Sequence, residues 1–172
     1  MAGSAATLVP WHGIRESPVV LVSGSESFLA DRAIRILSDR LKSAHDAVEV
    51  SDLDAADYAG GELFQLASPS LFGEPRFVRV SQVEKCTDAF LDDALAYLDS
   101  PEPDVVVVLR HGGGNRGKKL LDALKKGGDT VLLVECKEIK KDAERMGFIS
   151  AEFQRMGASI APAAQRALAD AF

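Results

Sequence analysis

The sequence has few of the residues that build reactive sites. Its 172 residues include two cysteines, three histidines and one tryptophan, and aromatic residues make up 6% of the chain. Cys86 and Cys136 lack the CxxC spacing of a zinc or redox site, so we expect two reduced structural thiols. His12, His45 and His111 are scattered, without a partner at the spacing of a catalytic triad or metal cluster. These patterns predict no catalytic residue, no cofactor and no metal ligand.

The sequence also lacks long apolar runs and an excess of positive charge. No stretch approaches the length that crosses a membrane, and residues 1–18 have no basic start followed by an apolar segment, as a secretory signal would. The formal net charge of −6 argues against a surface built mainly to neutralise phosphates. With 47% hydrophobic and 27% charged residues, the composition is that of an ordinary globular protein, and we expect a cytoplasmic location without membrane contact.

What the sequence does contain is a regular alternation of strand-like and helix-like segments. Short β-rich runs occupy residues 19–23, 47–51, 76–80, 105–109 and 130–135. Apolar residues recur at helical spacing in segments 28–41, 58–66, 88–98 and 118–126. This alternation predicts βαβ units, and therefore an α/β fold with a parallel sheet and helices on both faces. The continuous apolar run at 19–23 is typical of a central strand.

Three segments follow from these patterns. Residues 1–18 are small and polar and are interpreted as an N-terminal extension, and residues 19–137 form the α/β domain. From Glu138 onward the pattern is helical, with one helix ended by Gly157 and another that runs from Pro162 to Phe172. Because apolar positions continue to the last residue, we expect residues 138–172 to be the beginning of a helical lid domain, truncated at its end.

The turn after the first strand stands where a P-loop ATPase carries GxxxxGK[ST], whose backbone N–H groups and lysine hold phosphates. Here only the first glycine, Gly24, is present. Leu29, Ala30 and Asp31 occupy the positions of the second glycine, the lysine and the Ser/Thr, and Glu26 adds a negative charge. The sequence therefore predicts a P-loop NTPase-like domain with a degenerate nucleotide site and no intact ATPase motif.

The end of the third strand supports this prediction. A working ATPase has an acidic pair there that holds magnesium, whereas this chain has Ser81 and Gln82. Glu84 stands alone nearby, and a lone glutamate is more typical of a solvated surface than of a metal site.

A basic segment runs from Arg110 to Lys126 and includes Gly112, Gly113 and Gly114. Arginine and lysine beside a flexible glycine loop are suited to a phosphate backbone. No aromatic residue is interleaved for base stacking, which favours a solvated helix face. A nucleic-acid-binding module stays open as an alternative, as do a nucleotide-binding degenerate P-loop domain and an unrelated adaptor domain.

A second segment of interest is the loop before the third strand, Ser70-Leu71-Phe72-Gly73-Glu74-Pro75. Two large apolar side chains, Leu71 and Phe72, stand between the helix breaker Pro69 and a turn. They either cap the core at the entrance of the strand or form an exposed anchor pair for a pocket on another protein. Periodicity alone leaves both interpretations open.

Taken in order, several segments resemble the delta subunit of the bacterial DNA polymerase III clamp loader. These segments are the first strand and turn at 21–29, the loop 69–73 leading into 76–80, the strand 104–109, the helix start 118–120 and residues 134–137 before the helical part. The resemblance covers about residues 19–172. It implies an AAA+-like first domain, the start of a helical second domain, and a collar domain that is missing.

The resemblance also implies a function. Delta is a non-catalytic subunit that binds the ring-shaped beta sliding clamp through a Leu-Phe pair and helps open the ring for loading onto primed DNA. Here that role falls to Leu71 and Phe72, with Pro69 and Ser70 shaping the approach, although family members often carry a larger apolar residue where Pro69 stands. The implied partners are the beta clamp, the gamma/tau and delta prime subunits of the loader, and primed DNA within the complex. ATP would be handled by other subunits.

Overall fold

A six-stranded parallel sheet forms the centre of the first part of the chain. The computed structural model describes residues 4–171. The strands are β1 (Thr7–Pro10), β2 (Val19–Ser23), β3 (Glu49–Asp54), β4 (Arg76–Ser81), β5 (Val105–His111) and β6 (Val131–Glu135). Their order across the sheet is β1-β6-β2-β5-β4-β3, and every pair of neighbours is parallel. The predicted α/β parallel sheet is therefore confirmed.

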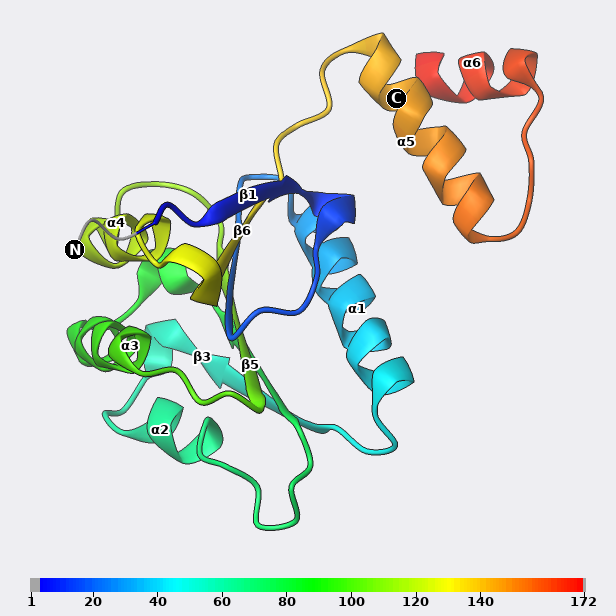
Figure 1. The fold of residues 1–172 in the computed structure, drawn as a ribbon. Helices are drawn as coiled ribbons and strands as arrows, with labels where there is room; N and C mark the ends of the chain where they lie inside the picture. Colours follow the sequence, from blue (N-terminus) through cyan, green and yellow to red (C-terminus); the bar gives the residue numbers. More distant parts are fainter. Residues whose placement is uncertain (1–3, 172) are drawn as a thin grey trace. The chain divides into compact units, whose positions relative to one another are not determined.

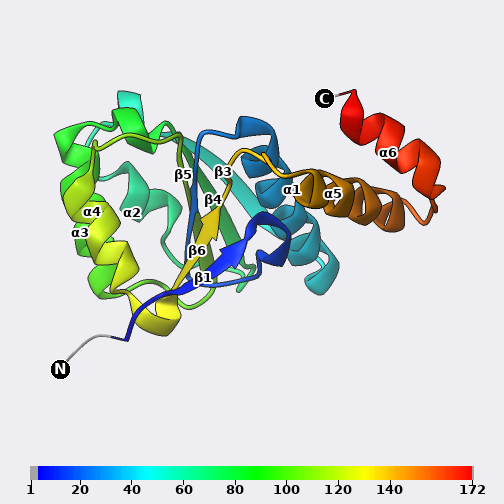
Figure 2. The same cartoon turned by 90° about the horizontal axis from the view of Figure 1, so that it is seen from above.

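The apolar composition of β2 explains its central place. Val19 and Leu21 belong to the core on one face of the sheet, and Val20 and Val22 alternate to the opposite face and are equally buried. The helices of this part are α1 (Ser27–Ala44), α2 (Glu62–Leu66), α3 (Asp88–Asp99) and α4 (Lys118–Lys125). Figures 1 and 2 show α1 on one face and α2, α3 and α4 on the other. A strand with buried side chains on both faces needs this double cover.

The prediction for the N-terminal segment was wrong. Residues 1–18 were expected to be an extension outside the α/β domain, but β1 pairs in parallel with β6 and adds an edge strand to the sheet. Ile14 is fully buried, and the Arg40 side chain donates to its carbonyl. Most of β1 is exposed, so it lacks the apolar alternation by which a strand is recognised in a sequence.

The bounds of α2 and β3 also differ from the predicted ones. The predicted helix at 58–66 is only five residues long, because Gly61 adopts a left-handed φ of 91° immediately before Glu62. The second predicted strand, 47–51, lies at 49–54, since its last residues, which include the acidic Asp52 and Asp54, hide the strand pattern around the buried Leu53.

The rest of the chain is a helical unit. Contacts divide the chain into one compact unit that ends at Lys137 and a second that begins at Glu138. The second unit contains α5 (Asp142–Arg155) and α6 (Pro162–Asp170), which are joined by hydrogen bonds from the Gln165 amide to the Met146 carbonyl and the Ser150 hydroxyl, both 2.6 Å. Helix α6 ends at Asp170, two residues before its predicted end at Phe172, which lies outside the described residues. No helix in residues 4–171 combines the length and apolar character needed to cross a membrane.

Candidate functional site

The turn after β2 is closed by the protein's own backbone. The Gly24 N–H donates to the His111 carbonyl (3.1 Å), and the Glu26 N–H donates to the Cys136 carbonyl (3.3 Å). Gly24 has a φ of +135°, and a Cβ at this position would overlap the Cys136 carbonyl. Carbonyl groups at the ends of β5 and β6 thus occupy the N–H groups that a P-loop directs at phosphates.

The polar residues at the end of β4 also serve structural roles. The Ser81 hydroxyl donates to the Leu53 carbonyl (3.3 Å), and the Gln82 amide donates to the Asp54 carboxylate (2.5 Å). Gln82 itself has a left-handed φ of 54°. Within the described part of the chain, no three His, Cys, Asp or Glu side chains are grouped as a metal site requires.

Glu84 was expected to be a solvated surface residue, but it holds the glycine loop after β5. Its carboxylate accepts from the Gly112 N–H at 2.8 Å. Burial raises the pKa of Glu84, but the hydrogen bonds from the N–H groups of Gly112 and Glu84 and the positive charge of Arg110 outweigh this effect, so the pKa lies below its ordinary value. His111, almost fully buried, accepts from the Gly113 N–H through Nδ1 and therefore donates from Nε2 to the Arg116 carbonyl.

The two arginines of the basic segment are bound within the protein. Arg110 donates to the carbonyls of Gly24 and His111, and Arg116 donates to the Cys86 carbonyl and the Asp88 carboxylate. Exposed lysines in and beside α4 remain, namely Lys118, Lys119, Lys125 and Lys126. The segment is therefore less available to phosphates than its composition indicates.

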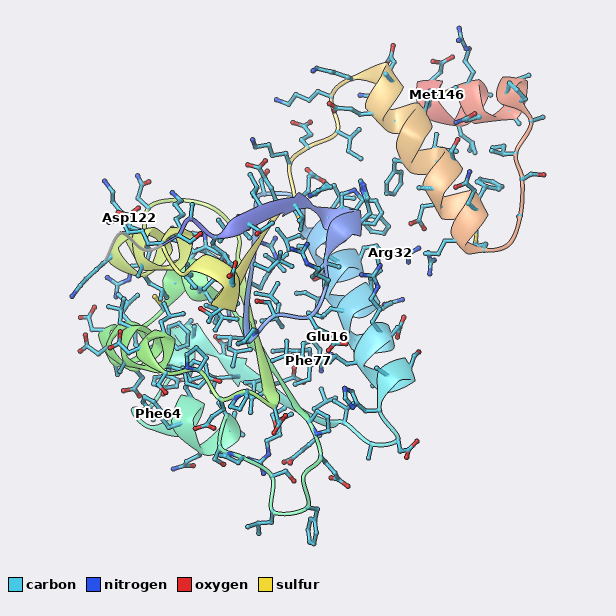
Figure 3. All side chains as sticks on the ribbon, viewed as in Figure 1. Glu16, Arg32, Phe64, Phe77, Asp122 and Met146 are labelled. Carbon is cyan, nitrogen blue, oxygen red and sulfur yellow. The ribbon has the colours of Figure 1, made fainter. Side chains whose placement is uncertain are left out.

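The loop between α2 and β4 presents two large apolar side chains to solvent. Leu71 is 95% exposed and Phe72 is 87% exposed, whereas Phe77, five residues later in β4, is fully buried (Figure 3). The first interpretation of this pair, that Leu71 and Phe72 cap the core, is therefore wrong. An exposed Leu-Phe pair is a costly feature in water unless another surface covers it.

The loop has a defined local structure. The Phe72 N–H donates to the Ser70 hydroxyl (3.2 Å), and the Gly73 N–H donates to the Ser70 carbonyl (3.4 Å). Gly73 has a φ of +73°, so the chain reverses there without the steric cost that a side chain would add. Ser70 thus organises the turn that presents Leu71 and Phe72, and Pro69 is exposed before it.

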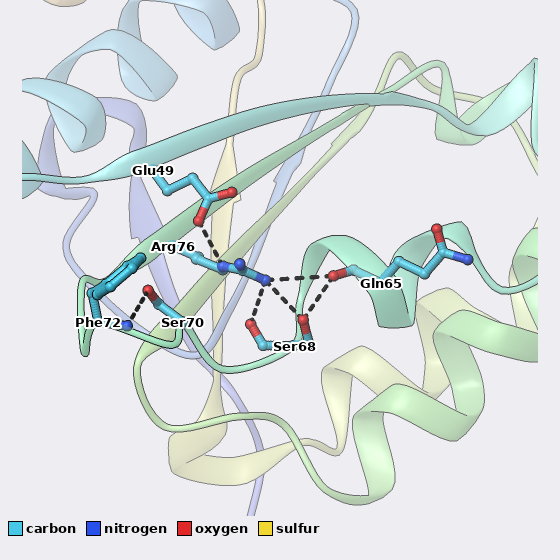
Figure 4. A network of polar contacts seen from close by, with 6 residues as sticks. All are labelled: Glu49, Gln65, Ser68, Ser70, Phe72 and Arg76. Atoms are coloured by element: carbon cyan, nitrogen blue, oxygen red, sulfur yellow. Dashed lines mark hydrogen bonds and ion pairs between the residues drawn. The ribbon is translucent and has the colours of Figure 1, made fainter.

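The base of the loop is held by Arg76 (Figure 4). Its guanidinium contacts the Glu49 carboxylate at the start of β3 and the carbonyls of Gln65 and Ser68 at the end of α2. The backbone adds bonds on both sides, from the Glu49 N–H to the Pro75 carbonyl and from the Arg76 N–H to the Asp104 carbonyl, each 3.0 Å.

Helix α2, which leads into the loop, is anchored to α3. The Asp93 carboxylate accepts from the Tyr58 hydroxyl (2.6 Å) and from the Gly61 N–H (2.7 Å), and the Tyr58 oxygen accepts from the Leu63 N–H (3.0 Å). Burial, together with the hydrogen bond to Asp93, raises the pKa of Tyr58 to about 12. The position of the loop is thus fixed from α2 as well as from the sheet.

The loop between α2 and β4 and the turn at Gly24 lie at opposite ends of the parallel strands. The loop enters β4 at its amino end, whereas Gly24 follows the carboxyl end of β2, and all strands run in the same direction. Figure 1 shows the loop extending beyond the end of the sheet between α2 and β4.

Comparison with known proteins gives a structural relative. No family model and no curated sequence matches the chain. Among solved structures, the chain resembles the DNA clamp loader delta protein of Bacillus subtilis, with a TM-score of 0.60 and 23% identity, over 88% of this chain and 47% of that protein. The chain thus spans about half the length of that protein, and over most of its own length it shares the α/β fold of that clamp loader delta protein.

Proposed function

We propose that this chain acts in DNA replication as the delta subunit of the DNA polymerase III clamp loader, which binds the beta sliding clamp and helps open the ring. The observation that carries the proposal is the exposed pair Leu71 and Phe72 on a turn organised by Ser70. The likeness in fold to a DNA clamp loader delta protein supports it. Pro69 and Ser70 complete the proposed clamp-binding residues.

The energetics of such an anchor pair are adequate. Burying a Leu and a Phe side chain contributes roughly 1.5–3 kcal/mol each from apolar transfer. Part of this free energy is offset by the conformational entropy that both partners lose on binding. The loss is smaller for a loop that is already structured. Two anchors with additional rim contacts therefore support a usable affinity.

Ring opening requires one further property. Binding shifts a closed ring toward an open form only when the chain binds the open form more tightly, because equal affinity for both forms shifts nothing. We propose that the turnover of ATP belongs to the gamma/tau subunits, which assemble with delta and delta prime around primed DNA. The occupied N–H groups of Gly24 and Glu26 support a non-catalytic role for this chain.

The test is calorimetric titration of the chain into the purified sliding clamp of the same organism. Leu71→Ala/Phe72→Ala is expected to lose at least about a hundredfold in affinity, since two buried anchors are removed. Leu8→Ala/Met156→Ala is a matched control, because both residues are apolar and 61% exposed but lie far along the chain from the loop. Equal clamp affinity of the two double variants would show that Leu71 and Phe72 do not contribute to clamp binding.

The exposed lysines of α4 favour one second candidate, nucleic-acid binding through the segment Arg110–Lys126. Such binding depends steeply on salt, because each neutralised phosphate releases a counterion. It predicts that Lys118→Ala/Lys119→Ala lowers both the affinity of the chain for DNA and its salt dependence. The clamp-binding proposal predicts no change in clamp affinity for this variant.

A further inference from the structure

Arg76 is the residue that closes the anchor loop at its base. It is the first residue of β4, and its side chain is 18% exposed. Its Nη1 atom donates to the Ser68 carbonyl (2.7 Å), to the Ser68 hydroxyl (2.8 Å) and, more weakly, to the Gln65 carbonyl (3.5 Å). One guanidinium therefore joins the residue after the loop to the residues immediately before it.

The same guanidinium is oriented by β3. Its Nε atom donates to the Glu49 carboxylate at 2.8 Å, so the planar group is fixed at two of its nitrogens (Figure 4). The carbonyls at the end of a helix lack intrahelical partners. The Gln65 carbonyl accepts from the Ser68 hydroxyl at 2.8 Å and more weakly from Arg76, and the Ser68 carbonyl, just after the helix, accepts from Arg76. A lysine has a single nitrogen and cannot reach Glu49 and Ser68 in the same fork geometry.

A neighbouring ion pair separates this role from simple strand pairing. Arg79 and Asp52 join the same two strands through two hydrogen bonds of 2.7 Å each. Both of these bonds connect β4 to β3, whereas the Arg76 guanidinium also reaches α2 and the loop. What Arg76 adds to the β3–β4 pairing is therefore the connection to the end of α2 and the entry of the loop.

We infer that Arg76 is a positioning residue, which holds the turn in the conformation that presents Leu71 and Phe72 to a partner. This inference rests on the proposed function for its consequence in binding. A loop that is ordered before binding loses less conformational freedom when its side chains enter a pocket. Without Arg76 the loop entry is released from β3 and β4, and each binding event has to order it again.

The test measures loop order and clamp binding separately, on the whole chain. In ¹⁵N relaxation, the amides of Leu71, Phe72 and Gly73 are expected to have order parameters near the rigid value of about 0.85, and Arg76→Met is expected to lower them below about 0.6. The same variant is expected to weaken clamp binding about tenfold. Arg79→Met, the matched control, is expected to leave both quantities unchanged.

Arg76→Lys keeps a cation beside Glu49 and serves if Arg76→Met fails to fold. This variant is expected to keep the stability of the sheet but to leave the order parameters of the loop amides low. If Arg76 acted only as an ion pair with Glu49, the lysine would keep these order parameters at the wild-type value. Unchanged order parameters in folded Arg76 variants overturn the inference. If the wild-type chain does not bind the clamp, the proposed function fails, and the order parameters alone decide whether Arg76 positions the loop.

Discussion

Leu71 and Phe72 are the most exposed of the large apolar side chains in the described part of the chain. Phe77 and Phe90 are fully buried, whereas the anchor pair stands almost entirely in water. Sequence periodicity could not separate these cases, because a Leu-Phe pair before a strand fits both a core and an exposed site. The tertiary arrangement decides between them, since Ser70 and Gly73 turn the chain outward.

A single glycine provides a residue-scale test of the closed phosphate turn. In Gly24→Ala, the new Cβ overlaps the Cys136 carbonyl and the φ of +135° is strained, so we expect a loss of at least about 2 kcal/mol in the free energy of unfolding. Urea denaturation measures this loss. Gly60→Ala is the matched control, because a Cβ at that position would meet no atom within 4 Å beyond its own chain neighbours. A change there as large as at Gly24 would contradict the account.

At the scale of helices and strands, the bounds were predicted most accurately where the side chains of an element are most completely buried. The strand at 19–23 was predicted with its observed bounds, because all of its apolar positions are covered. Strand β1 was missed because edge exposure removes that signal, and the start of α2 was missed because Gly61 leaves the helical region. The role of Glu84 could not be predicted from the sequence either, since its partner is a backbone N–H 28 residues away.

The contact between Glu84 and Gly112 joins the segment after β4 to the loop after β5, and it predicts a pH dependence. Because folding lowers the pKa of Glu84, its contribution to stability is present above the ordinary pKa of 4.5 and is lost as the pH falls through the folded value. At pH 7, Glu84→Gln is expected to cost about 1 kcal/mol in the free energy of unfolding.

Guanidinium denaturation between pH 3 and 7, with both proteins, is the measurement. The difference between wild type and Glu84→Gln is expected to shrink below about pH 4.5. A difference that stays constant over this range would show that the ionised carboxylate is not what holds the glycine loop.

At the scale of the whole α/β unit, two contrasting features lie at opposite ends of the parallel strands. At the carboxyl edge, a turn that resembles a phosphate loop in position is sealed by the carbonyls of His111 and Cys136. At the amino edge, a loop held by Arg76 and Ser70 exposes two anchors. The exposed apolar pair thus lies at the opposite end of the strands from the Gly24 turn.

The predicted order of segments was a reliable guide to this architecture. Five of the six strands and the crossover helices were recognisable from apolar spacing, and the absence of a lysine after Gly24 already indicated a degenerate site. The hydrogen bonds that seal the turn, and those by which Arg76 holds the loop, join residues that are not neighbours in the sequence. No local pattern encodes such contacts.

We propose that Leu71 and Phe72 bind a sliding clamp and favour its open form. The most direct measurement is the affinity of the wild-type chain and of Leu71→Ala/Phe72→Ala for the intact ring and for a clamp variant whose subunit interface is disrupted. The wild-type chain is expected to bind the disrupted clamp more tightly than the closed ring, and the double variant is expected to lose binding to both. Absence of binding by the wild-type chain, or undiminished binding by the double variant, would contradict this proposal.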